Sequence, residues 1–145
     1  MNILFFMIPK AEVCYAEAEW SLRQVAEKMI ANDLTSIPLL NAKGQYEGTI
    51  SEGDLFRFIK QKANLNYKEA ESTPIRELSH ERKVEPIRFD AQMKDVVKLA
   101  GQQNFVPVLG DNDLFMGIIT RKAIINYLDE KLKNIPDNLF PEHLR

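Results

Sequence analysis

The sequence lacks most of the features that would assign it to a class of secreted protein or enzyme. Its single cysteine, Cys14, excludes an intrachain disulfide and favours a reducing compartment, for which the cytoplasm is the simplest expectation. The two histidines, His80 and His143, lie far apart and give no metal-ligand spacing with Cys14. No GxGxxG, Walker A or GxSxG motif occurs. We therefore expect no catalytic residues, no metal and no cofactor.

An excess of charge and a long hydrophobic run are also missing. The net charge is −2, so neither nucleic acid nor an anionic membrane is an expected partner. The apolar stretch 1–8 is too short to span a bilayer and contains no basic residue, so we expect it to pack on the core, with a partner-binding patch as the alternative. A hydrophobic content of 45% in 145 residues is typical of one globular domain that buries its own core.

An internal repeat is the strongest signal in the chain. The apolar, proline-containing stretch 37–40 recurs at 106–109, and the glycine-led stretch 48–51 recurs at 117–120 with the same separation along the chain. Upstream, two amphipathic stripes with helical spacing recur at a slightly larger separation, at Leu22, Val25, Ala26 and Met29 and at Met93, Val96, Val97 and Ala100. Coincident separations of this kind indicate two copies of one structural unit.

Each copy follows the same predicted order of elements, β-α-β-β-α, which makes the chain an α/β protein. The first copy has expected strands at 12–16, 37–40 and up to 51, with helices from 21 and from 51 to about 62. The second has strands at 84–89, 106–109 and up to 120, with helices from 90 and from 120 to about 133. Ser21 to Gln24 predicts a capping box, and Asp90 is the expected N-cap of the equivalent helix. We divide the chain into 1–66, a first repeat with its N-terminal segment; 67–133, a linker and second repeat; and 134–145, a tail.

The repeated motifs resemble those of the CBS domain. The first copy contains Ile37-Pro38, then Gly48-Thr49-Ile50-Ser51, then the pattern Ser51-x-x-Asp54. The second contains Val106-Pro107, then Gly117-Ile118-Ile119-Thr120, then Thr120-x-x-Ala123. The resemblance covers roughly residues 5–132, and residues 6–10 look like the start of small free-standing CBS pairs of Gram-positive bacteria.

This resemblance implies two repeats related by a pseudo-two-fold axis, with a homodimer as the common assembly. The cleft between CBS repeats usually holds an adenosine ligand such as AMP, ATP or, in some free-standing bacterial pairs, cyclic di-AMP. The chain is thus expected to be a sensor that binds an adenine nucleotide and reports it to a downstream protein, without catalysis. A ligand-free dimeric scaffold is the alternative, and a small enzyme is a third possibility.

Ser51 and Asp54 are the first candidates for the binding site. The family role of this aspartate is to accept hydrogen bonds from ribose hydroxyls, and Ser51 could reach ribose or phosphate. The local alternative is an ordinary capping arrangement at a helix start, and both roles can coexist. Ala123 stands where the second copy would have the aspartate, so we expect one competent nucleoside site per chain.

The other candidates are basic or hydroxyl-bearing residues. Thr120, Arg121 and Lys122 stand at a helix start, where added cations favour an anion, so they are candidates for phosphate. Solvent-exposed side chains are the alternative. By resemblance, the pocket is also lined by the segment from Thr35 through Ser36 and Ile37 to Pro38, which would contact base and phosphate, and by Lys10, which would add charge. An ordinary loop and a surface lysine are the alternatives here.

Overall fold

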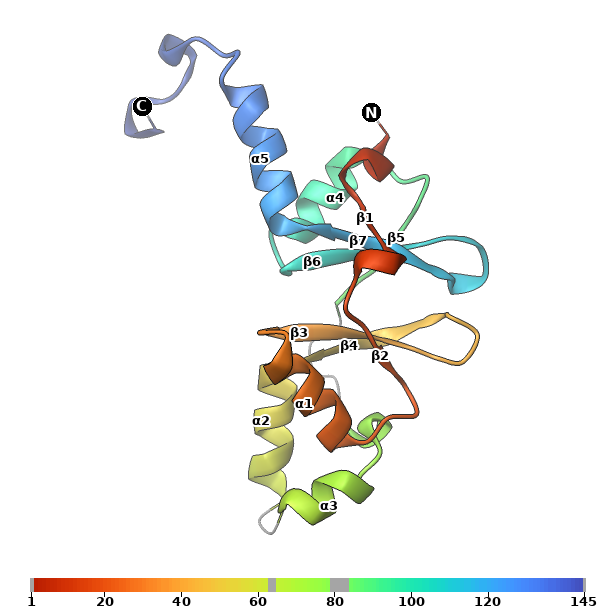
Figure 1. Cartoon of the computed structure of the whole chain (residues 1–145). Helices are drawn as coiled ribbons and strands as arrows, with labels where there is room; N and C mark the ends of the chain where they lie inside the picture. Colours follow the sequence, from red (N-terminus) through yellow and green to blue (C-terminus); the bar gives the residue numbers. More distant parts are fainter. Residues whose placement is uncertain (1, 63–64, 79–83, 145) are drawn as a thin grey trace.

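Two small sheets lie one above the other in the computed structural model, which describes residues 2–62, 65–78 and 84–144 (Figure 1). The first sheet has the order β2 (Ala16–Glu17), β3 (Ser36–Leu40), β4 (Tyr46–Ser51). The second has the order β1 (Ile8–Pro9), β7 (Phe115–Thr120), β6 (Phe105–Leu109), β5 (Ile87–Arg88). Helices α1 (Leu22–Ala31), α2 (Glu52–Gln61) and α3 (Tyr67–Ser72) lie on the outer side of the first sheet, and α4 (Met93–Ala100) and α5 (Arg121–Leu132) on the outer side of the second.

The two halves repeat each other in register, which confirms the predicted mixed α/β architecture and the β-α-β-β-α order. Ser36 pairs with Ser51 in the first hairpin, and Phe105 pairs with Thr120 at the equivalent positions of the second. Both hairpins have a register shift at the same place, before Leu40 and before Leu109. The repeated sequence motif is therefore a repeated strand pairing.

Side chains along these strands alternate between a face that packs on the core of the same half and a face that points toward the other sheet. Ile37 and Ile50 are fully buried in the core beneath the first sheet. Because successive strand residues point to opposite faces, Ser36, Thr49 and Ser51 point the other way, toward the second sheet. The polar residues of the hairpin thus lie between the halves.

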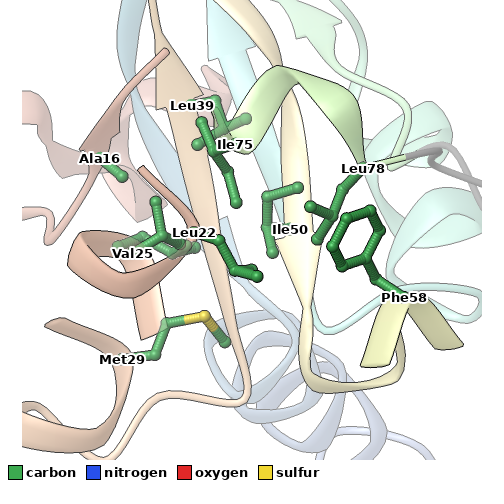
Figure 2. Packing of buried hydrophobic residues seen from close by; sticks show 10 residues of the cluster. Ala16, Leu22, Val25, Met29, Leu39, Ile50, Phe58, Ile75 and Leu78 are labelled. Carbon is green, nitrogen blue, oxygen red and sulfur yellow. The ribbon is translucent and has the colours of Figure 1, made fainter. Parts of the chain in front are cut away.

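Two segments pack on the half that is farther away in the sequence: the N-terminal segment packs on the second half, and the segment around Ile75 packs on the first. Strand β1 pairs with β7, with Ile8 opposite Ile118, and Ile3 is 1% exposed in the second core. Conversely, Ile75 and Leu78 belong to the first core, where Ile75 lies beside Leu39 and Leu78 beside Phe58 (Figure 2). The packing therefore departs from the division at 66/67, because strand pairing and apolar burial, not chain proximity, decide which half a segment joins.

Some predicted boundaries were wrong. The first strands, predicted at 12–16 and 84–89, are the two-residue strands β2 and β5, and a turn of 3₁₀-helix occupies Lys10–Glu12. The capping box of α1 is present, but α4 has Gln92 rather than Asp90 as its N-cap, without a side-chain bond. Cys14 is half-buried beside the first core and lies in no strand. The described part of the tail is largely exposed.

A substitution at Gly117 tests how much the pairing of β1 with β7 contributes to stability. A Cβ atom there would collide with the backbone carbonyl oxygen of Ile8, which β1 holds against β7. We expect Gly117→Ala to lower the free energy of unfolding by about 1–3 kcal/mol in urea denaturation, because backbone rather than a flexible side chain must move.

Gly101→Ala is the matched control, since an added Cβ there meets the Lys98 carbonyl oxygen at an ordinary 3.4 Å and φ is −70°. The control should change the free energy by less than about 0.5 kcal/mol. Equal stability of the two variants would contradict the importance of the β1–β7 contact.

Candidate functional site

A cleft of about 640 Å³ lies between the two halves. Its volume falls within the range of sites for small organic ligands, roughly 300–1,000 Å³. We call it the inter-repeat cleft. It is lined by residues of both sheets, of two helix starts and of the segment before β5: Ser36, Thr49, Ser51, Asp54, Val84, Glu85, Gln102, Gln103, Asn104, Phe105 and Arg121.

The start of α2 presents a buried carboxylate to this cleft. Asp54 is 4% exposed; its Oδ2 accepts a 2.8 Å hydrogen bond from the Ser51 N–H, and its Oδ1 pairs with Arg57 at 2.6 Å. The Ser51 hydroxyl oxygen accepts the Asp54 N–H at 3.1 Å, so the capping box expected as the local alternative is formed. These bonds engage each carboxylate oxygen once, and a carboxylate has about four acceptor positions. Asp54 can therefore cap the helix and still accept further hydrogen bonds from a ligand.

Arg121 brings positive charge to the cleft from the other half. Its Nε donates a 2.8 Å hydrogen bond to the carbonyl oxygen of Ala100, the last residue of α4, where the helix dipole favours a cation. The side chain is partly buried and is held at the cleft wall by this bond. An anionic group between Asp54 and Arg121 would thus find its counter-charge on the second repeat.

A glutamine fixes the segment that enters β5 along the cleft. The Gln103 side chain accepts the N–H of Glu85 at 3.1 Å and donates to the carbonyl oxygens of Glu85 at 2.8 Å and Phe105 at 3.0 Å. Sequence reasoning missed this wall, because residues 84–85 and 102–105 are remote in sequence from the Ser51–Asp54 motif. The only available signal was the equivalence of Val84 with Val13 across the repeat.

A tyrosine behind the cleft joins two of its walls. The Tyr46 hydroxyl lies 2.7 Å from the Thr49 hydroxyl and donates to the carbonyl oxygen of Val84 at 3.1 Å. Burial raises the pKa of Tyr46 to about 12, against the smaller opposing effect of the hydrogen bond with Thr49. Thr49 itself is 4% exposed. Neither residue was a candidate at the sequence level, although the alternation of side chains along a strand places Thr49 and Ser51 on one face of β4.

Four of the ten predicted site residues meet in the cleft: Ser36, Ser51, Asp54 and Arg121. Thr120 caps α5 by accepting the Ala123 N–H, and the carbonyl oxygen of Thr35 accepts the Glu52 N–H. Ile37 belongs to the first core, and Pro38 is buried opposite Thr49.

The two lysines lie elsewhere. Lys122 is exposed and does not line the cleft. Lys10 lines a separate pocket of about 310 Å³ with Tyr15, Glu17 and Asn41, because the 3₁₀ turn at Lys10–Glu12 directs the chain past the hairpin loop and away from the cleft.

Exchanging each cleft residue for its equivalent in the other repeat defines a second position, which we call the mirror-related position. It does not have the polar groups of the inter-repeat cleft. Three replacements separate it from the cleft: Ala123 for Asp54, Ile118 for Thr49, and Glu52 where the cleft has Arg121. It therefore lacks the carboxylate and the hydroxyl, and carries an acid in place of the base. Of the two related positions, only the inter-repeat cleft has this set of polar groups.

Other chemistry is not evident in the described ranges. Residues 2–62, 65–78 and 84–144 contain no group of three His, Cys, Asp or Glu placed to hold a metal. Over the same residues, no helix is long and apolar enough to cross a membrane. His80 lies outside the described residues.

Comparison with known proteins assigns the fold. Residues 6–61 match the CBS domain family. A CbpB crystallised in complex with c-di-AMP is 26% identical over 92% of this chain and 88% of its own, with a TM-score of 0.80. CbpB from Streptococcus agalactiae is 25% identical over 94% and 87%, with a TM-score of 0.76. CBSX2 in complex with AMP shares the fold at 16% identity over 90% and 97%, with a TM-score of 0.71.

Among curated protein sequences, no significant match is found. The family match covers the first repeat, and the structural match covers nearly the whole chain. Both agree with the repeated hairpins described above. Residues 6–61 therefore match the CBS domain family, and the chain as a whole has the fold of the CbpB crystal structures.

Proposed function

We propose that this chain is a regulatory module that binds an adenine nucleotide in the inter-repeat cleft and has no catalytic activity of its own. One observation carries the proposal. Within the described residues, the two buried polar side chains are Thr49 and Asp54, and both line this cleft. Each keeps hydrogen-bond acceptor positions beyond the bonds that it makes within the protein, so their concentration in one cleft supports a binding role. The CbpB bound to c-di-AMP, which resembles the chain over most of its length, supports the choice of ligand class.

The charges of the cleft suggest how a nucleotide would lie. Asp54 would accept hydrogen bonds from ribose hydroxyls, with the hydroxyls of Ser51 and Ser36 beside it. Arg121, on the opposite repeat, would bind phosphate, since a guanidinium matches phosphate oxygens in geometry and charge. A single ligand would then contact both halves at once.

Contact with both halves supplies a physical basis for regulation. A ligand that binds better to one arrangement of the two repeats shifts the population toward that arrangement. A downstream protein that distinguishes the arrangements would read the nucleotide concentration.

The alternative function is a dimeric scaffold that binds no ligand. The proposed compartment is the cytoplasm, because the single cysteine favours a reducing environment.

We also propose that the module is a homodimer, because exposed apolar residues recur with the repeat. Phe56 and Ile59 on α2 are 70% and 53% exposed, and Ile125 and Leu128, at the equivalent positions of α5, are 56% and 37% exposed. Both helices lie toward the left of the molecule in Figure 1. Apolar surface repeated in this way fits a two-fold interface with a second copy of the chain.

The binding proposal is tested by isothermal titration of the protein with AMP, ATP and cyclic di-AMP. One of them should saturate the protein near one ligand per chain or per dimer. Arg121→Ala should weaken it by roughly tenfold or more, because a charge-assisted hydrogen bond contributes about 1.5–3 kcal/mol. Asp54→Ala should weaken it severalfold or more.

Lys122→Ala is the matched control: it removes an equal charge from the next residue of α5, outside the cleft, and should leave the affinity within twofold. No binding and no thermal shift with any of the three nucleotides would favour the scaffold. If Arg121→Ala and Lys122→Ala lowered the nucleotide affinity equally, Arg121 would not be the phosphate contact of the cleft.

The dimer proposal is tested by sedimentation equilibrium. The doubly substituted protein Phe56→Glu with Ile125→Glu should sediment as a monomer at concentrations where the unsubstituted chain is a dimer, because charge on both stripes opposes their burial. Ile30→Glu on α1, where Ile30 is 81% exposed, is the control and should leave the dimer intact. A dimer that survives the double substitution would place the interface elsewhere.

A further inference from the structure

The hydrogen-bond chain behind the inter-repeat cleft has a fixed direction. The carbonyl oxygen of Val84 can only accept, so the Tyr46 hydroxyl donates its single hydrogen to it. The bond of 2.7 Å between Tyr46 and Thr49 must then take its hydrogen from Thr49. The order is therefore Thr49 to Tyr46 to Val84.

This direction leaves the Thr49 hydroxyl oxygen as an acceptor on the cleft wall. Its hydrogen is committed to Tyr46, and only lone pairs remain for a ligand. Thr49 is 4% exposed and lines the cleft, so bulk water has little access to those lone pairs. A ligand atom beside Thr49 must donate a hydrogen bond, because an acceptor there would face another acceptor without a hydrogen between them.

The order of the chain holds at neutral pH. The Tyr46 hydroxyl is protonated at neutral pH, and burial raises its pKa further, to about 12. Tyr46 is also fixed in place, since its ring stacks on Phe115 with centroids 6.2 Å apart. Neither titration nor rotation of the ring is expected to reverse the direction of the bonds.

The mirror-related position has no such chain. Phe115 is the equivalent of Tyr46 in the second repeat, and Ile118 is the equivalent of Thr49, so both hydroxyls are missing there. The pair of hydroxyls therefore occurs on the same side of the molecule as Asp54 and Arg121. The second repeat forms the equivalent hairpin without these hydroxyls, so the strand pairing does not require the hydrogen-bond chain.

We propose that Thr49, oriented by Tyr46, selects the base of the bound nucleotide by accepting a hydrogen bond from the exocyclic 6-amino group of adenine. A base with a 6-carbonyl, such as hypoxanthine, is disfavoured at this point because it presents an acceptor. The spacing fits: Thr49 stands two strand residues, about 6.6 Å, from Ser51, a separation comparable with the distance from ribose to the 6-position of a purine. The inference rests on the proposed nucleotide site and names its specificity residue; Tyr46 acts as a positioning residue.

The test compares two ligand pairs that differ in the 6-substituent, AMP with IMP and cyclic di-AMP with cyclic di-IMP, by isothermal titration. The unsubstituted protein should bind the adenine member of the pair it recognises roughly tenfold tighter or more. Thr49→Val should weaken the adenine member about five- to tenfold and leave the 6-oxo member within twofold. Tyr46→Phe frees the Thr49 hydrogen to donate to a 6-carbonyl. This variant should therefore bind the 6-oxo ligand more tightly and lower the ratio of adenine to 6-oxo affinity severalfold.

Ile118→Val, at the mirror-related position of Thr49, is the control and should change neither affinity nor ratio. A selectivity ratio that persists in both Thr49→Val and Tyr46→Phe would overturn the inference while leaving the nucleotide site intact. Equal weakening of both members would also overturn it, because that is the result of a merely structural role. Absence of binding of all four ligands to the unsubstituted protein would overturn the proposed function and this inference together.

Discussion

The face-to-face packing of the two β-hairpins is the interaction on which the rest of the structure depends. Each sheet has one face on its own core, and its other face must be covered by the opposite sheet, because a small sheet with an uncovered apolar face is not stable in water. A third apolar cluster lies at this contact; it contains Leu40 and Leu109 from equivalent positions and the stacked rings of Tyr46 and Phe115. The crossed segments add to it: β1 lies in the second sheet, and Ile75 lies in the first core. The halves therefore support each other in folding, and the cleft exists because they meet.

The same packing makes the site asymmetric although the fold is repeated. Both hairpins have the same strand pairing and the same register shift, so the backbone offers two equivalent surroundings. Side chains distinguish them. The acidic and hydroxyl groups Asp54, Thr49 and Tyr46 come from the first repeat and the cation Arg121 from the second, so the functional groups converge on one side only. Loss of polar groups on the other side removes the cost of burying them while keeping the hairpin contact.

Local interactions and ligand chemistry coincide at the start of α2. Ser51 and Asp54 cap the helix and also line the cleft, so stability and binding use the same atoms. This is a general property of helix starts that face a ligand site: the orphan N–H groups must be satisfied, and the residue that satisfies one of them is already held in a fixed orientation. Arg57 neutralises the buried carboxylate from the next turn. The ion pair and the Ser51 N–H together offset part of the desolvation cost of burying this carboxylate.

The sequence by itself determined the repeat, the α/β class, the β-α-β-β-α order within each repeat and the approximate positions of the long strands and of α1, α2 and α5, because hydrophobic periodicity and capping residues act over a few residues of chain. It missed α3, which lies in the expected linker, and the start of α4. It also determined that Asp54 has no counterpart at Ala123. The tertiary structure alone decided that β1 joins the second sheet, that Lys10 lies in another pocket, and that Val84, Glu85 and Gln103 form a wall of the cleft. These contacts join segments far apart in the chain, and they follow from how two surfaces fit together. No local pattern encodes that fit, so the direction of the Thr49–Tyr46–Val84 chain could be recognised only from the folded molecule.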